Sequence, residues 1–173
     1  GAGSGAAFFD AFASLNVGAL TATTVNDIAS KAFGTDSIMI GDTTTGTIDA
    51  ANHNTGVGVD VFAALTSGDE NVAVGTASLD ANTTGSFLTA VGYQSLSGNT
   101  TANNNTGLGH KALLTTTTGA DNTAVGKDSL RLTTTGANNT AVGKDSLRAN
   151  TTGTDNTAVG ALANDANTTG SYN

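Results

Sequence analysis

Apolar and small residues recur along most of the chain at a fixed interval of seventeen residues. Each repeat contains a pentapeptide of the form N-T-A-V-G, or a close variant, that ends in a glycine. These glycines are Gly58, Gly75, Gly92, Gly109, Gly126, Gly143 and Gly160. The residue before each of them is apolar: Val57, Val74, Val91, Leu108, Val125, Val142 and Val159. One interval earlier lies S-I-M-I-G at 37–41, so eight units fill residues 37–172 without an insertion. A fixed period of this length is typical of a repeat architecture.

Aligned in register, the units share the consensus N-T-A-V-G-x-x-S-L-x-x-N-T-T-G-x-x, whose positions we number 1 to 17. Seventeen residues are too few for two helices and a turn, and Thr, Val, Asn and Gly disfavour helix. We expect two short strands in each unit, at T-A-V and around S-L, with corners at the glycine of position 5 and at T-T-G. Stacked units would pair as parallel strands about 4.8 Å apart. The sequence therefore predicts an all-β fold, a parallel β-solenoid or β-roll of eight coils.

The chain is expected to divide into an aperiodic segment at 1–36 and the repeat domain at 37–173. The first segment contains Phe8, Phe9, Phe12 and Phe33, and the spacing of Phe8, Phe12 and Leu15 predicts a short helix within 6–15. We interpret residues 1–36 as a cap on the open edge of the solenoid or, alternatively, as a subunit-docking segment. Because Asn173 begins a ninth unit, a further expectation is that residues 1–36 cover the last coil of a neighbouring subunit in a head-to-tail filament.

Each unit offers only two reliably large apolar side chains, at positions 4 and 9. These are few against the conformational entropy lost when seventeen residues become ordered. Packing several chains around a common axis would bury a second face of each coil. We therefore expect a homo-oligomer, in the form of a parallel trimer.

The composition narrows the possible partners and chemistry. The formal net charge is −8, and six Lys and Arg residues are too few to form the basic surface that nucleic acid or an anionic membrane requires. No apolar run reaches the length of a membrane span. His53 and His110 occupy different unit positions and are interpreted as surface residues. The twin K-D-S-L segments at Ser129 and Ser146 fit a charge ladder better than a Ser/Lys nucleophile pair, so we expect no enzyme activity and no cofactor.

Polar residues stack at three further places in the aligned units. Asp69, Glu70, Asp121 and Asp155 lie at the last two positions, where they are either solvated corner residues or, less favoured, oxygen ligands for Ca²⁺. The asparagines of position 1 are expected to hydrogen-bond along the stack. The N-T-T sequons at 82–84, 99–101, 150–152 and 167–169 formally permit N-glycosylation. The adjacent threonines of T-T-G predict a turn, although a Thr-rich stripe also fits an ice-binding solenoid.

The N-T-A-V-G pentapeptide resembles the strand motif of trimeric autotransporter adhesin heads, and the longer unit resembles repeats of bacteriophage tail fibres. This resemblance covers residues 37–173. It implies a trimerising parallel β-roll that serves as a stiff structural fibre outside the cell, at the cell surface or on a virion, with glycans as further partners. The unit of seventeen residues departs from the generally shorter adhesin repeat. A difference in coil shape is therefore expected. The alternative function at this stage is ice binding.

Overall fold

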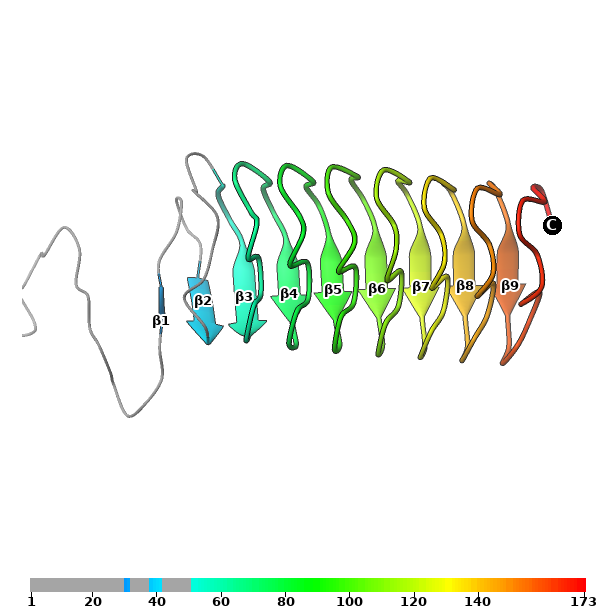
Figure 1. Cartoon of the computed structure of the whole chain (residues 1–173), viewed down its shortest axis with the longest axis horizontal. Coiled ribbons are helices and arrows are strands. Elements are labelled where there is room, and N and C mark those ends of the chain that lie inside the picture. The colour runs from blue at the N-terminus through cyan, green and yellow to red at the C-terminus, as the bar shows by residue number, and fades with distance from the viewer. Residues whose placement is uncertain (1–29, 32–37, 42–50) are drawn as a thin grey trace, which may run out of the picture.

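The computed structural model describes residues 30–31, 38–41 and 51–173, in which one nine-stranded sheet runs along the molecule in chain order. The strands are β1 (Ser30–Lys31), β2 (Ile38–Gly41), β3 (Thr55–Gly58), β4 (Val72–Val74), β5 (Thr89–Val91), β6 (Thr106–Leu108), β7 (Thr123–Val125), β8 (Thr140–Val142) and β9 (Thr157–Val159). β1 pairs with β2 in the antiparallel sense, and every later pair is parallel. The strands stand in a row along one side of the rod (Figure 1).

Equivalent residues of neighbouring coils lie side by side along the whole row. Val57 pairs with Val74, Val74 with Val91, and so on at an unchanging offset of seventeen. Six turns therefore separate β3 from β9, and the predicted parallel β-solenoid with a seventeen-residue unit is confirmed. Of the first expected unit, 37–53, the described residues are β2 and residues 51–53. The helix expected within 6–15, and Phe8, Phe9, Phe12 and Phe33, lie outside the described residues.

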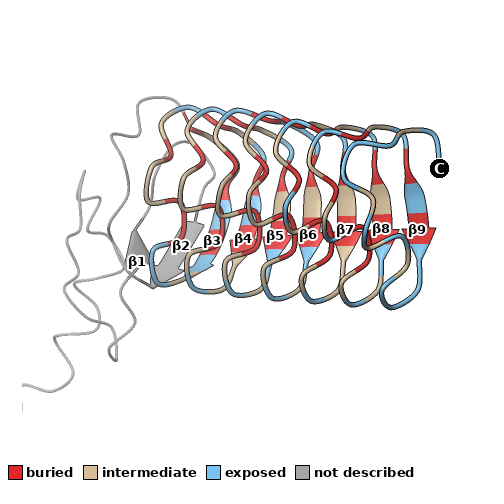
Figure 2. Cartoon of the chain, turned by 45° about the vertical axis from the view of Figure 1, so that its right-hand side comes forward, coloured by how far each residue is buried: buried red, intermediate tan, exposed pale blue. Residues whose placement is uncertain are grey.

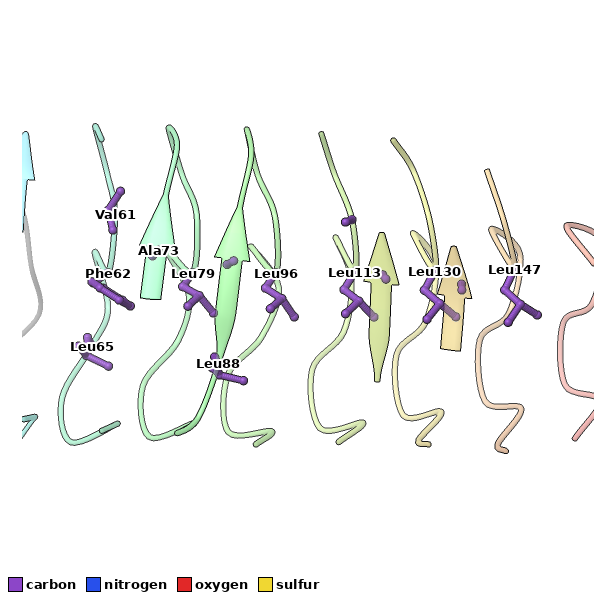
Figure 3. Close-up of a cluster of buried hydrophobic side chains, with 14 of the residues drawn as sticks. Val61, Phe62, Leu65, Ala73, Leu79, Leu88, Leu96, Leu113, Leu130 and Leu147 are labelled. Atoms are coloured by element: carbon purple, nitrogen blue, oxygen red, sulfur yellow. The ribbon is translucent and has the colours of Figure 1, made fainter. Parts of the chain in front are cut away.

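The core is a narrow column between the sheet and the opposite wall of the solenoid. Position 3 of each strand points inward and is Ala or Gly in β3 to β9. Position 9 on the opposite wall supplies the large side chains, which stack above one another (Figure 3). These fully buried residues are Phe62, Leu79, Leu96, Leu113, Leu130 and Leu147. Where position 9 is Phe62, position 3 is Gly56, because a Cβ on Gly56 would lie 3.1 Å from the Phe62 ring.

Position 4 corrects one expectation from the sequence, because its apolar side chains do not enter the core of the chain. Since successive residues of a strand point to opposite faces, the inward turn of position 3 sends positions 2 and 4 outward. Figure 2 shows this alternation, with each strand from β3 to β9 buried at its central residue. The wall opposite carries leucine, and the space left across from it admits only Ala or Gly.

The second strand predicted around S-L is also wrong within residues 51–173, where this part of each unit forms turns. Position 9 adopts left-handed backbone, with φ of 52° at Leu79 and 48° at Leu130, and position 7 does the same. This conformation breaks the pleat at a cost of roughly 1–2 kcal/mol per residue. Coils still hydrogen-bond here, since the Leu130 N–H donates to the Ser146 carbonyl at 3.0 Å. Full burial of the Phe or Leu at position 9 offsets the strain in all coils from residue 54 except the last, where Asn164 is exposed.

Buried asparagines at position 1 join each coil to the next, as expected from the sequence. The Asn139 side-chain nitrogen donates to the Gly153 carbonyl at 2.9 Å and to Oδ1 of Asn122 at 3.0 Å. Its own Oδ1 accepts the backbone N–H of Asn156 at 3.1 Å. Each asparagine thus supplies the hydrogen-bond partner that the backbone of the corner lacks. Position 1 is asparagine in every unit between residues 54 and 173 except at Leu88.

Glycines at two corners let the coils approach closely enough for these bonds. At position 5, Gly75 has φ of 126°, and a Cβ there would lie 2.7 Å from the carbonyl of Gly92. At position 15, a Cβ on Gly136 would meet the backbone carbonyl of Gly153. A larger residue at position 5 would force neighbouring coils apart, whereas position 15 is glycine in every unit from residue 54 except the one that carries Ala102.

Truncation of a position 9 leucine should be costly, whereas truncation of a nearby exposed leucine should not. Leu130→Ala removes a side chain with no solvent exposure and should lower the free energy of unfolding by about 2–5 kcal/mol. Leu132→Ala, two residues away and 38% exposed, is the matched control and should cost about 0.5 kcal/mol or less. Chemical denaturation followed by circular dichroism measures both. Equal losses would contradict the assignment of the core.

The adjacent asparagines 138 and 139 give a second matched pair. Asn139→Ala deletes the bonds to Gly153 and Asn122 and leaves the buried Asn156 N–H without its acceptor, so we expect a loss on the order of 2–4 kcal/mol. Asn138 is exposed at φ of 58°, where glycine is comfortable, so Asn138→Gly should change stability little. Thermal and urea unfolding midpoints provide the comparison. A larger loss at residue 138 than at residue 139 would refute the ladder as a source of stability.

Candidate assembly face

The outward side of the sheet presents two regular columns of side chains, which together we call the Thr/Val face. Position 2 is Thr in six of the seven strands from β3 to β9, and position 4 is Val or Leu in all seven. The face comprises Thr55, Val57, Val72, Val74, Thr89, Val91, Thr106, Leu108, Thr123, Val125, Thr140, Val142, Thr157 and Val159. β-Branched residues favour the extended backbone of these strands, so one choice of residue supports both the strand and its surface.

The apolar column of this face is accessible to solvent in the isolated chain. Val57, Val91, Leu108 and Val142 expose between 36% and 40% of their surface. With strands about 4.8 Å apart, seven of them give a column on the order of 30 Å long. The main-chain groups of the strands bond to neighbouring coils, so the face offers methyl and hydroxyl groups and little free backbone. This apolar column is therefore a candidate surface for packing against another protein surface.

The Thr runs of the T-T-G segments lie elsewhere and behave as the sequence predicts for a turn. The Thr83 hydroxyl at position 13 donates to the Thr100 carbonyl at 2.9 Å, and Thr100 donates to Thr117 at 3.2 Å. Position 14 is exposed, as at Thr84 and Thr135. The sequence analysis considered only the T-T-G runs as a threonine array. It missed the T-x-V pattern of the strands, whose first and third residues lie on one outward face.

The residues considered for chemistry do not form a reaction centre. Ser129 and Ser146 are buried, and each hydroxyl donates to the strand carbonyl of the next coil, at Ala141 and Ala158, with a distance of 3.1 Å. The hydroxyls therefore serve the fold, while Lys127 sits on the surface beside Asp128. His53 and His110 are both exposed and lie far apart along the rod.

The acidic corner residues likewise remain dispersed. Glu70, Asp121 and Asp155 are exposed, and the Asn104 side-chain nitrogen donates to Oδ1 of Asp121 at 3.0 Å. Asp69 accepts the Asn52 N–H at 2.7 Å. Among the described residues, no group of three or more His, Cys, Asp or Glu side chains could hold a metal ion. The arrangement supports solvated corner residues.

In three of the four N-T-T sequons, the asparagine side-chain nitrogen to which a glycan would be attached is buried. Asn82, Asn99 and Asn150 have no solvent exposure, and each donates its side-chain N–H to the carbonyl of position 15 in its own coil. A glycan at these residues is incompatible with the folded coil. The consensus asparagine at position 12 is therefore a corner-forming residue.

Over the residues that the structure describes, no helix has the length and hydropathy needed to cross a bilayer. Comparison of the chain with protein-family models, curated proteins and solved structures finds no match.

Proposed function

We propose that this chain is the rod segment of a structural fibre, in which copies assemble through the Thr/Val face. The observation that carries the proposal is the column of outward Val and Leu side chains along one side of a repetitive stack, in which all but Val74 and Val125 are exposed. The role is mechanical and non-enzymatic. Continuous parallel pairing gives stiffness, and assembly covers the apolar column that each chain leaves in water.

Three parallel copies around an axis along the rod fit this face. Rotation about such an axis brings identical residues to the same level, so Val142 of each copy meets Val142 of the others. The regular seventeen-residue register then repeats the same contact in every coil from β3 to β9. The thin core supports the proposal, because most coils bury small residues against a single Leu or Phe, and only the earlier coils add Val61, Leu65 and Leu88. The resemblance of N-T-A-V-G to adhesin heads and tail fibres points the same way.

The wider role that we propose is that of a tail fibre, surface adhesin or extracellular filament, located on a virion, at a cell surface or outside the cell. The support is the resemblance of the repeat, together with a surface rich in Thr, Asn and Asp that suits contact with glycans. Head-to-tail contact through residues 1–36 stays a prediction, with Phe8, Phe9, Phe12 and Phe33 as its docking residues.

A change of charge on the Thr/Val face should separate the copies without unfolding the coil. The full chain should sediment at three times its mass of 16.9 kDa, with an elongated shape. Val142→Asp places charges beside one another in a dry interface and should shift the protein to monomer, because unpaired buried charge is strongly unfavourable. Thr135→Asp at the exposed corner of position 14 is the control and should remain trimeric. A wild-type monomer in analytical ultracentrifugation would refute the assembly.

Ice binding is a second candidate, favoured by one specific observation. The Thr/Val face holds its hydroxyl and methyl groups at fixed intervals on a row of short parallel strands. Such an array can hold water in a regular pattern. The two candidates compete for the same face, since assembly covers the residues that would meet ice.

Thermal hysteresis separates these functions. If the fibre proposal holds, solutions of the assembled protein should show none, even at high concentration, because the Thr/Val face is covered. An ice-binding monomer would show hysteresis that Thr123→Lys abolishes and that Thr135→Lys leaves intact. That result would replace the fibre proposal by the second candidate.

A further inference from the structure

Positive charge is concentrated on one short stretch of this acidic chain. Within residues 51–173 all five Lys and Arg side chains fall between positions 111 and 148, at unit positions 6, 7 and 10. We call Lys111, Lys127, Arg131, Lys144 and Arg148 the basic ridge. At unit positions 6, 7 and 10 of these coils the acids are Asp128 and Asp145 alone, since Asp121 lies at position 17, so this ridge carries three more positive than negative charges.

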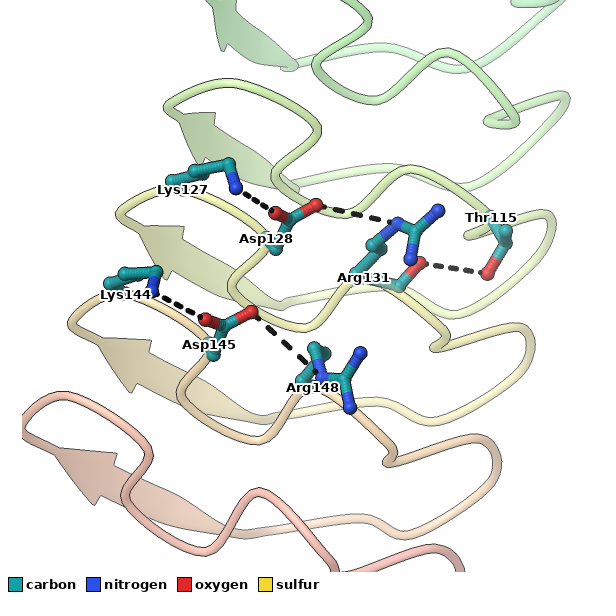
Figure 4. Close-up of polar contacts among 7 residues, drawn as sticks. All are labelled: Thr115, Lys127, Asp128, Arg131, Lys144, Asp145 and Arg148. Carbon is teal, nitrogen blue, oxygen red and sulfur yellow. Dashed lines mark hydrogen bonds and ion pairs between the residues drawn. The ribbon is translucent and has the colours of Figure 1, made fainter.

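The two carboxylates hold the cations in place rather than cancel them. Asp128 lies 3.1 Å from Nζ of Lys127 and 3.4 Å from Nε of Arg131. In the next coil Asp145 lies 3.4 Å from Lys144 and 3.9 Å from Arg148. Figure 4 shows the two triads side by side, with each Asp between its Lys and its Arg. One carboxylate thus serves two cations.

The lysine side chains of the ridge are far more exposed to solvent than its aspartate side chains. The Lys127 and Lys144 side chains are 55% and 62% exposed, whereas those of Asp128 and Asp145 are 13% and 16% exposed. The cations therefore project into solvent above largely covered carboxylates, and the outer surface of the ridge is positive. Because equivalent residues of adjacent coils are about 4.8 Å apart, Lys127 and Lys144 repel one another unless an anion lies between them.

An aromatic pair continues the ridge in the coils before these triads. The rings of Tyr93 and His110 stack with centroids 5.3 Å apart and planes inclined by 22°. Lys111 Nζ lies 5.9 Å from the centroid of the Tyr93 ring, which is itself exposed. Position 6 therefore runs from Tyr93 through His110 to Lys127 and Lys144, a length of about 14 Å. This run offers a flat ring at one end and cations at the other.

Acidic residues bound the ridge at both ends. Asp60 and Asp80 occupy the same side of the earlier coils, at unit positions 7 and 10, and Asp165 occupies position 10 of the last coil. Seven further acids within residues 51–173 lie at other unit positions or in other coils: Asp60, Asp69, Glu70, Asp80, Asp121, Asp155 and Asp165. A long polyanion laid along the rod would meet this repulsion, so the ridge suits a short anionic segment.

We propose that the basic ridge binds an anionic oligosaccharide, a short sugar chain that carries carboxylate or sulfate groups. Its acidic groups pair with Lys127, Lys144, Arg131 and Arg148, and a sugar ring rests on Tyr93. The guanidinium and ammonium donors match carboxylate and sulfate oxygens. The inference rests on the proposed function in one respect, namely that positions 6 to 10 stay on the outside of the assembled rod.

The test is calorimetric titration of the full chain with defined oligosaccharides. A sulfated heparin fragment and a carboxylated oligogalacturonide are the two anionic probes, and a neutral maltooligosaccharide of equal length is the control. We expect one or both anionic probes to bind, with affinity that falls as salt rises. Lys127→Gln with Lys144→Gln should weaken binding at least about tenfold. Asp121→Asn with Asp155→Asn, at the opposite corner, should leave binding equal or tighter.

Several outcomes would overturn the proposal. Equal binding of the neutral sugar, or unchanged affinity in the double Lys variant, removes the charge basis. Tighter binding of a short single-stranded oligonucleotide than of either anionic sugar would assign the ridge to nucleic acid. Sedimentation of the same samples keeps the two proposals apart, because a monomer that binds the probe refutes only the fibre, and a trimer that does not bind refutes only the ridge.

Discussion

The hydrogen bonds of the buried asparagine at position 1 set the spacing and the register of the whole stack. Each side chain donates to the carbonyl of position 15 and accepts the backbone N–H seventeen residues later, as Asn139 does with Gly153 and Asn156. An added or deleted residue would move the acceptor away from its donor in that coil. The constant length of the unit follows from this geometry. Glycine at position 5 follows as well, because a Cβ on Gly75 would collide with the next coil, and position 15 is glycine in every unit from residue 54 except the one that carries Ala102.

The same tight stacking decides what the surface can do. Most coils bury one large side chain, at position 9, with Val61, Leu65 and Leu88 added in the earlier coils, and the strand opposite turns a small residue inward. The Val and Leu side chains of position 4 are then left on the outside, where they form the apolar column of the Thr/Val face. The proposed assembly is thus a consequence of the coil's dimensions. The charged residues do not fit in the core and lie at the corners of the coils. Five of them form the basic ridge.

The parallel fold was predictable because the period, the strand residues and the corner glycines all agree. Which side of the strand faces the core was harder to predict. The sequence does carry a signal, because position 3 is Ala or Gly in every unit from residue 54, as expected for the side that packs in the narrow core. The missing second strand had a signal too. Within residues 51–173, none of the non-glycine residues with positive φ is Thr, Val or Ile, although this part of the chain is rich in Thr. β-Branched side chains are disfavoured in that conformation, so their absence from positions 7, 9 and 17 of the units from residue 54 onward marks the turns.

The pairings between side chains could not have been derived from the pattern. That Asp128 lies between Lys127 and Arg131, or that Tyr93 stacks on His110, depends on the depth and direction of each corner. Sequence alone gives only their unit positions. The interior role of the N-T-T asparagines is similar, since a sequon looks the same whether its nitrogen faces solvent or, as at Asn82, a carbonyl of its own coil.

Thiol protection at the centre of the Thr/Val face tests the central claim most directly. The chain has no cysteine, so Val142→Cys and Thr135→Cys each introduce a single thiol, one on the face and one on the outer corner. Reaction with a maleimide is followed in the native and denatured protein. The account predicts that the thiol at residue 142 is protected until denaturation, while the thiol at residue 135 reacts at once. Equal and rapid reaction at both positions in the native protein would show that the Thr/Val face is open to solvent and would contradict the account.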